Sequence, residues 1–163
     1  MPTGEAAARS ARWLALLVPA ALLGGAYVSQ YGFGLYPCEM CWWQRYAHFA
    51  ALFFGVLAFA QRRSKIAVPL AMLAIATASA LGGYHAGVEY GWWEGITACS
   101  TVAERMPGQS SLDAIMNAPI VRCDHAPWTL FGISLAGFNF LISGAAAVAI
   151  AWLLGRSQVQ VAT

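Results

Sequence analysis

The stretch WTLFGISLAGFNFLISGAAAVAIAWLL, residues 128–154, carries no charged side chain and only one strongly polar one, Asn139. A helix needs roughly 20 consecutive apolar residues to cross the hydrocarbon core of a bilayer. This stretch is long enough, and it lacks the strict apolar/polar alternation of a transmembrane β-strand. It therefore predicts a membrane-spanning helix at about residues 130–154.

Three further apolar windows precede this one and predict helices at about residues 13–31, 42–60 and 66–84. The first follows Arg9 and Arg12, as the core of a signal peptide would. It is long for such a core, however, and no Ala-x-Ala cleavage site follows it. We therefore expect it to remain as the first membrane helix.

The composition agrees with an integral membrane protein. Hydrophobic residues make up 60% of the 163 residues and charged residues 10%, against about 45–50% and 25% in soluble domains. A soluble chain of this length has too little interior to bury so much apolar surface. The formal net charge is only +2 and the basic residues are dispersed, which argues against nucleic-acid binding. We expect one all-α domain over residues 1–163, a four-helix membrane bundle.

The basic residues predict its orientation. Six of the nine Lys and Arg side chains flank the windows on one side: Arg9, Arg12, Arg62, Arg63, Lys65 and Arg156. The positive-inside rule makes that side cytoplasmic, with both termini inside. A long outer loop, about residues 85–127, then faces the other side. Within it, Ser110–Met116 predicts a short helix that either packs on the bundle or lies in the membrane interface.

All four cysteines fall on the outer side and form two kinds of pair. Cys38 and Cys41 make a C-x-x-C directly before the second window, whereas Cys99 and Cys123 are widely spaced within the long loop. An even cysteine count in an oxidising compartment favours disulfide chemistry. A C-x-x-C closes a small ring that adds little chain-entropy stability. It therefore suits a redox couple better than a structural bridge.

Arg45 lies four residues after Cys41, on the same face of the predicted helix. The positive end of that helix can stabilise a thiolate and lower the pKa of a C-x-x-C cysteine. A charge inside the membrane is costly and usually functional, so Arg45 is a candidate to stabilise the Cys41 thiolate or a reduced electron acceptor. The alternative is that Arg45 only extends to the interface.

A disulfide that oxidises other thiols must pass two electrons to an acceptor. The chain has no dinucleotide-binding glycine pattern, no P-loop and no c-type haem motif. At the membrane edge, a lipid-soluble quinone is the natural acceptor. His48, three residues after Arg45, and His85, at the end of the third window, are further candidates to contact it.

The segment CEMCWWQR, residues 38–45, resembles the signature of the DsbB family, and residues 128–132 resemble that family's entry into its last helix. Gln44 departs from it, since some relatives carry an acid there. The resemblance implies a multi-pass protein of the bacterial inner membrane that reoxidises a periplasmic DsbA-like thioredoxin. It also implies ubiquinone or menaquinone as cofactor, bound near Arg45, with looser involvement of His85.

The resemblance further implies a route for the electrons. The partner attacks a Cys99–Cys123 disulfide at Cys99, Cys38–Cys41 reoxidises that pair, and Cys41 reduces the quinone. We expect the loop pair to be the exposed one.

Three other interpretations remain open on the sequence. A vitamin-K-epoxide-reductase-like quinone reductase has a similar set of parts, but there the loop cysteines precede the C-x-x-C. A membrane scaffold with two structural disulfides would need no Arg45. A zinc site formed by the four cysteines is disfavoured where disulfides form first, so we expect no metal.

Overall fold

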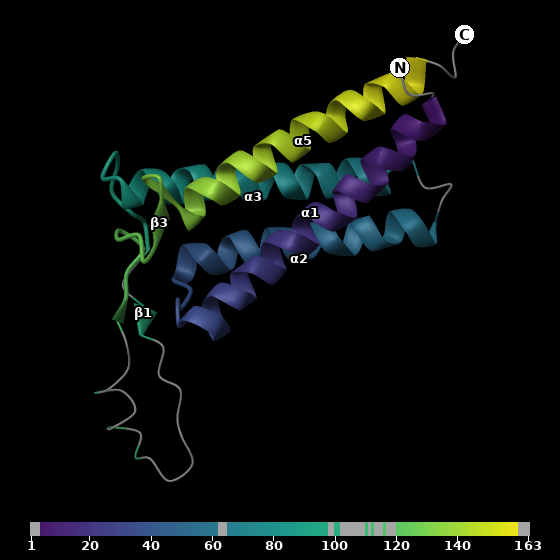
Figure 1. The fold of residues 1–163 in the computed structure, drawn as a ribbon. Helices are drawn as coiled ribbons and strands as arrows, with labels where there is room; N and C mark the ends of the chain where they lie inside the picture. Colours follow the sequence, from purple (N-terminus) through teal and green to yellow (C-terminus); the bar gives the residue numbers. More distant parts are fainter. Residues whose placement is uncertain are drawn as a thin grey trace.

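Four long helices form most of the computed structural model, which describes residues 4–61, 65–97, 100–101, 110, 112, 116 and 120–159. They are α1 (Gly4–Phe33), α2 (Glu39–Ala60), α3 (Ala67–Glu89) and α5 (Leu135–Val159). Helices α1 and α3 each pack against both α2 and α5, so the four form a ring. Figure 1 shows both chain ends at one end of this bundle and the labelled strands at the other.

Small side chains bring the helices close together. Helix α1 buries a residue every four positions: Ala7, Ala11, Ala15, Pro19 and Leu23. Small residues at such spacing let transmembrane helix backbones approach each other, where packing and hydrogen bonds drive association. Helix α2 comes close to α1, since a Cβ added at Gly55 would lie 2.7 Å from the carbonyl oxygen of Ala15.

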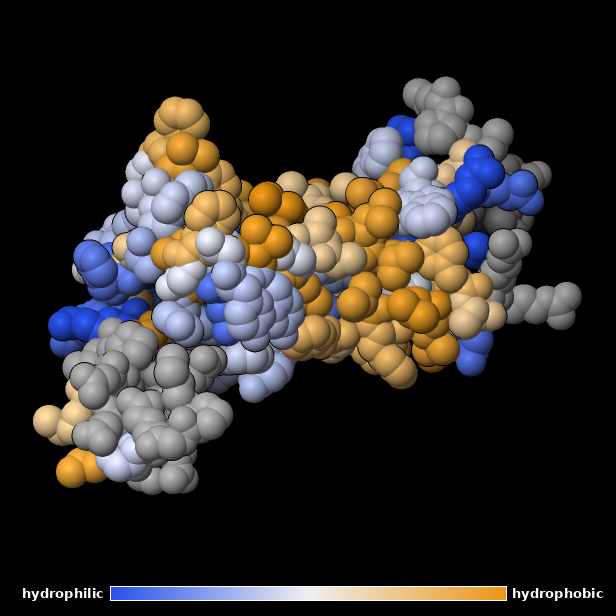
Figure 2. All heavy atoms as spheres, turned by 60° about the horizontal axis from the view of Figure 1, so that its bottom comes forward, coloured by the Kyte–Doolittle hydropathy of each residue, from blue (hydrophilic) through white to orange (hydrophobic). Residues whose placement is uncertain are grey.

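The outer surface of the bundle is apolar along its middle (Figure 2). Large apolar side chains of the helices are exposed, among them Phe53, Leu73 and Val148. Three of the described helices are long and apolar enough to cross a membrane: α1, α3 and α5. A contiguous apolar surface of this kind is costly in water but suits lipid. The chain is therefore a helical, multi-pass membrane protein.

Helix α2 is not among those three, although the sequence predicts that it crosses the membrane. Its 22 residues give sufficient length, but Gln44, Arg45 and His48 occupy its first half. These polar side chains lower its mean hydropathy. All three are buried inside the bundle, so they do not reach the lipid-facing surface.

The helix boundaries differ from the predicted ones at both ends of the bundle. Helix α1 begins at Gly4 instead of residue 13, and α5 ends at Val159 instead of residue 154. Helix α3 continues through His85 to Glu89 instead of ending at residue 84. Helix α5 begins at Leu135 instead of residue 130, because β3 (Thr129–Leu130) and β4 (Ile133–Ser134) form an antiparallel hairpin. Its two turn residues, Phe131 and Gly132, have φ angles of 53° and 78°, as a two-residue hairpin turn of type I′ requires.

A second small ladder joins the two sides of the outer loop. Strands β1 (Ser100–Thr101) and β2 (Ile120–Val121) pair antiparallel, with Ser100 opposite Val121. The predicted helix Ser110–Met116 falls largely outside the described residues. Of its apolar face, Leu112 and Met116 are described, and both are helical and exposed.

The contact at Gly55 leads to a stability prediction. In Gly55→Ala the new methyl group overlaps Ala15, and overpacking of this kind costs about 1–3 kcal/mol. Thermal unfolding in detergent, followed by circular dichroism, should show a lower midpoint. Gly24→Ala is the matched control, because a Cβ there meets no atom within 4 Å and alanine has the better helix propensity. Equal midpoints for the two variants would contradict close α1–α2 packing.

Candidate functional site

Cys38 and Cys41 lie at the start of α2. Cys38 follows Pro37 and is the N-cap residue, and its carbonyl accepts the first helical hydrogen bond from the Trp42 N–H at 3.2 Å. One turn later, Cys41 brings its sulfur to 3.3 Å from that of Cys38, and the Cys38 thiol donates to it. Both are free thiols in this structure. The pair is thus a hydrogen-bonded dithiol at the N-terminal end of α2.

Cys123 of the outer loop packs on this pair. It is buried in an apolar cluster with Cys38, Met40 and Val88, to which Val121 of β2 also contributes. The side chain of Cys123 thus packs against that of Cys38. The expectation that the loop pair is exposed is therefore wrong for Cys123, because the β1–β2 ladder returns the chain to the start of α2. Cys99 lies outside the described residues.

His85 approaches the pair from α3. Its Nε2 lies 3.5 Å from the sulfur of Cys38 and 3.7 Å from Oε1 of Glu89, one turn further along α3. His85 and the Glu89 side chain are buried. His85 is thus held between a cysteine and a carboxylate. The sequence-based hypothesis placed both His85 and Arg45 at the quinone. In the structure His85 lies beside Cys38.

Arg45 is also buried, 5% exposed, and α1 binds it firmly. Its Nη1 donates to Gln30 Oε1 at 2.6 Å, and its Nη2 donates to the carbonyl of Ala26 at 3.2 Å. The guanidinium also lies 4.9 Å from the ring centre of Tyr27 and 5.0 Å from that of Trp42. Hydrogen bonds to α1 and two cation–π contacts therefore fix it inside the bundle, which differs from an arginine that only extends to the interface.

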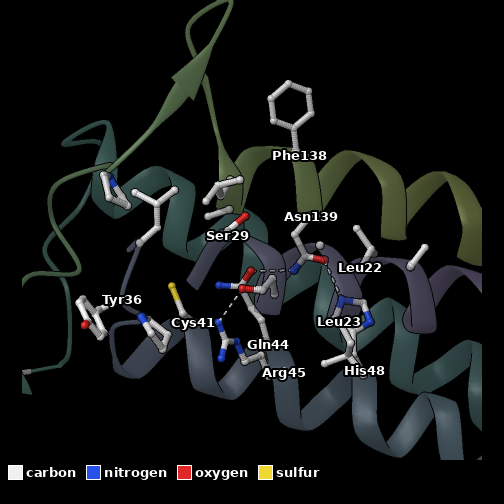
Figure 3. Close-up of a pocket in the computed structure, with 18 of the residues that line it drawn as sticks. Leu22, Leu23, Ser29, Tyr36, Cys41, Gln44, Arg45, His48, Phe138 and Asn139 are labelled. Atoms are coloured by element: carbon white, nitrogen blue, oxygen red, sulfur yellow. Dashed lines mark hydrogen bonds between the residues drawn. The ribbon is translucent and has the colours of Figure 1, made fainter. Parts of the chain in front are cut away.

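Arg45 and Cys41 meet at a cavity of about 240 Å³ between α1, α2 and α5 (Figure 3). Most of its walls are apolar, from residues such as Leu22, Leu23 and Phe138. The polar side chains in the wall include Gln44, Arg45, His48 and Asn139. A mostly apolar cleft with a few placed polar groups is the usual form of a small-molecule site.

A second cavity of about 230 Å³ is lined by Cys38, His85 and Val121, among others. Cys41 and Glu89 line both cavities, whereas Arg45 and His48 line only the first and Cys38 and His85 only the second. Cys41 therefore stands between the outer-loop side of the site and the cavity inside the bundle.

A chain of hydrogen bonds connects the polar residues of the bundle interior. Gln44 Nε2 lies 2.9 Å from Nδ1 of His85, and Gln44 Oε1 accepts from Asn139 at 2.7 Å. Oδ1 of Asn139 lies 2.8 Å from Nε2 of His48. Buried polar groups need partners of this kind in a membrane interior. The two histidines predicted from the sequence are thus joined through two amides.

The ring nitrogen of His85 and the sulfurs of Cys38 and Cys41 lie within 4.8 Å of one another. Thiolates and imidazole are the ligands that zinc prefers. This set differs from the four-cysteine site considered from the sequence. Oxidation of the two cysteines to a disulfide would remove two of its three ligands.

Burial changes the acidity of the cysteines outside the helices. The pKa of Cys38 is raised to about 12, first because its thiol donates to Cys41 and second because it is desolvated. Desolvation likewise raises the pKa of Cys123. The expectation of a lowered pKa therefore fails for Cys38, whose side chain makes no capping bond to the helix N–H groups.

Three residues of the site did not emerge as candidates from the sequence. Gln30 and Glu89 sit in segments whose pattern gave no sign that they face inward. Glu89 has a weak signal in its spacing, four residues after His85. Asn139 has a stronger one, because it is the only strongly polar residue in the last apolar window.

Comparison with known proteins identifies this arrangement. In a membrane protein, a helix that begins with a dithiol and carries a buried arginine one turn later is typical of a membrane thiol oxidoreductase. The family model "Disulfide bond formation protein DsbB" matches residues 8–153. The chain belongs to the DsbB family, and hence to the membrane oxidoreductases of disulfide bond formation, a family that uses quinone.

Two relatives match this chain over most of their length and most of its own. The disulfide bond formation protein B of Azoarcus sp. (strain BH72) is 34% identical over 86% of this chain and 89% of its own length. An uncharacterised protein of Rickettsia prowazekii (strain Madrid E) is 27% identical over 74% of this chain and 73% of its own. No solved structure matches the chain.

The hydrogen bond between the two cysteines leads to a prediction about thiol reactivity. Since only the thiolate reacts, alkylation of Cys38 in the reduced protein should keep rising with pH and show no plateau below about pH 10, given a pKa of about 12. In Cys41→Ala the main cause of the shift is lost, so the midpoint should move down toward the ordinary value of about 8.5.

Mass spectrometry of iodoacetamide adducts over a pH series measures both midpoints, which accessibility alone does not shift. Cys123→Ala keeps Cys41 and is the control, whose midpoint should remain high. A midpoint near pH 8.5 in the unmodified protein would contradict the hydrogen-bonded dithiol.

Proposed function

We propose that this chain is a protein-dithiol:quinone oxidoreductase that reoxidises a DsbA-like thioredoxin and passes the electrons to a membrane quinone. One observation carries the proposal. Cys41 borders the cavity inside the bundle, while its partner Cys38 contacts Cys123 of the outer loop. Two thiols with these contacts join a partner outside the membrane to an acceptor within it.

The first exchange occurs at the loop cysteines. The partner's two thiols lose two electrons and two protons, a Cys99–Cys123 disulfide is reduced, and the partner leaves with a disulfide. Attack at Cys99 would leave Cys123 as the departing thiol. Its burial against Cys38 supports its role as the residue that passes the electrons inward.

The second exchange occurs within the protein. Cys123 attacks the Cys38–Cys41 disulfide at Cys38, the cysteine that it packs against. The Cys99–Cys123 disulfide then re-forms, and Cys38 and Cys41 are left as the dithiol described above. Cys38 keeps its proton at neutral pH because its pKa is high. The reduced pair therefore retains its hydrogen bond until the acceptor oxidises it. His85, at 3.5 Å, is placed to take up that proton when the disulfide closes.

The residues of the larger cavity fit a quinone. Its apolar walls suit a lipid-soluble ring, Arg45 offers hydrogen-bond donors and positive charge, and Cys41 borders it. Cys41, Arg45 and His48 would hold the ring, whereas His85 would act through Cys38. A bound quinone supplies an acceptor for the two electrons and two protons that closure of the Cys38–Cys41 disulfide releases. Ubiquinone and menaquinone both meet this need.

The proposal includes a membrane topology for the four helices. All four helices, α2 included, cross the bacterial inner membrane as a single domain, with both termini in the cytoplasm and the loop cysteines in the periplasm. The distribution of basic residues supports this orientation. The termini lie at the same end of the bundle (Figure 1), as four crossings require.

The alternatives explain less of the site. A structural scaffold would not need a cysteine between two cavities or a buried arginine beside it. A vitamin-K-epoxide-reductase-like enzyme would carry its loop cysteines before the C-x-x-C, whereas Cys38 and Cys41 come first here. Zinc binding by the four cysteines would be revealed by zinc content in the purified protein.

Arg45→Met tests the quinone part of this proposal. It removes the charge at similar length, so the quinone KM should rise about tenfold or more, equivalent to about 1.4 kcal/mol of binding free energy. Arg45→Lys keeps the charge but loses the planar set of donors. Its quinone KM should lie between those of the unmodified protein and Arg45→Met. Steady-state quinone reduction measures this effect.

A single turnover, in which a preformed disulfide oxidises the reduced partner, does not use the quinone. Its rate should therefore be unchanged in Arg45→Met. Arg156→Met is the matched control, since Arg156 also packs on a tryptophan ring, that of Trp152, but near the C-terminal end of α5. Equal losses in the single-turnover and steady-state rates of Arg45→Met would make Arg45 a structural residue and refute its role at the quinone.

A further inference from the structure

His48 lies in the wall of the larger cavity (Figure 3), and one of its two ring nitrogens has no protein partner. The side chain is only 3% exposed, and Nδ1 is buried without a hydrogen bond. A buried polar atom with no partner costs free energy. Its neighbour Nε2, by contrast, is bound to Asn139 at 2.8 Å.

The surroundings of Asn139 decide which nitrogen of His48 carries the proton. Asn139 Nδ2 lies 3.1 Å from the carbonyl of Ala78 and 2.7 Å from Gln44 Oε1. The Ala78 carbonyl only accepts, so the amide NH₂ must face it, and the amide orientation follows from the network. Asn139 Oδ1 therefore faces His48 and accepts from it, and also from Ser143 at 2.9 Å.

Two consequences follow for His48. Its Nε2 carries the hydrogen, since Asn139 Oδ1 can only accept. In the neutral ring Nδ1 is then a bare acceptor. The missing partner of Nδ1 must for this reason be a hydrogen-bond donor.

Arg45 has the opposite character. A guanidinium is a donor only, so it pairs with an oxygen that carries lone pairs or negative charge. His48 lies three residues further along α2, about one helical turn deeper in the bundle. The residues of this cavity wall thus include donors at one turn of α2 and an unpartnered acceptor at the next.

We propose that Nδ1 of His48 accepts a hydrogen bond from a hydroxyl group of the reduced quinone, the quinol, and that Asn139 acts as a positioning residue that fixes the His48 tautomer. This inference rests on the proposed quinone function and adds to it a residue that distinguishes the two oxidation states. A carbonyl offers no hydrogen to Nδ1, whereas a hydroxyl does. His48 therefore favours the quinol over the quinone.

The test measures binding rather than turnover. In a Cys38→Ala background Cys41 lacks its partner for the C-x-x-C disulfide, so that neither ligand is oxidised or reduced by that pair. A short-chain ubiquinone and the matching ubiquinol are titrated under anaerobic conditions into the full-length protein in detergent. His48→Phe should weaken ubiquinol binding about three- to tenfold, the worth of one hydrogen bond, and change ubiquinone binding less than twofold.

Asn139→Leu should shift the ubiquinol-to-ubiquinone affinity ratio in the same direction, and it should have no further effect on that ratio in the His48→Phe background, because Asn139 acts through His48. Nitrogen NMR of labelled His48 should show the hydrogen on Nε2, and this preference should be lost in Asn139→Leu. Ser79→Ala is the control: Ser79 is buried and bonds to the carbonyl of Phe140, outside the network.

The outcomes separate the two proposals. If the background protein binds neither ligand, the quinone function itself fails. If both bind and His48→Phe weakens them equally, weakens ubiquinone more, or changes neither, the His48 inference is overturned while the quinone function stands. His48→Asn, a smaller polar substitution, replaces His48→Phe if the latter does not fold, and it is judged by the same ratio.

Discussion

The contact between Cys38 and Cys41, 3.3 Å from sulfur to sulfur, is the interaction on which the rest of the site depends. It exists because Pro37 and the first turn of α2 place the N-cap residue beside the residue three positions later. On one side of it Cys123 reaches Cys38, and on the other Cys41 borders the cavity inside the bundle. If the two sulfurs were apart, the outer loop and the cavity would have no chemical connection.

The second constraint is that polar groups inside a membrane bundle must find partners within the protein. Arg45 meets it through Gln30 and Ala26 of α1, and His85 through Gln44 and Glu89. The same network that satisfies these groups also fixes their hydrogens. The buried amides of Gln44 and Asn139 therefore satisfy their neighbours and also set which ring nitrogens carry a hydrogen.

Much of this arrangement was predictable from the sequence. The four apolar windows predicted the four helices, and the spacing from Cys41 to Arg45 predicted that both would meet at one site, since those positions share a helix face. The hairpin before α5 was missed because Thr129–Ser134 continues the apolar composition of the helix, and only the turn at Phe131 and Gly132 interrupts it.

The long-range contacts were not predictable in the same way. Burial of Cys123 depends on the pairing of β1 with β2, two strands of two residues each, which are too short to leave a periodic pattern. The link from His48 to Asn139 joins α2 to α5, and single residues on different helices carry no spacing signal. The raised pKa of Cys38 has this origin only in part: its first cause is the thiol of Cys41, three residues away, and its second is burial, to which the outer loop contributes.

The most direct test of the central claim is quinone reduction by the purified protein supplied with a reduced DsbA-like thioredoxin and a short-chain ubiquinone. The proposed route predicts one quinol for each disulfide formed in the thioredoxin, because two electrons and two protons pass from one to the other. Cys38→Ala, which breaks the link between Cys123 and Cys41, should form neither product catalytically. Oxidation of the thioredoxin without quinol, or quinol formation that persists in Cys38→Ala, would contradict the account.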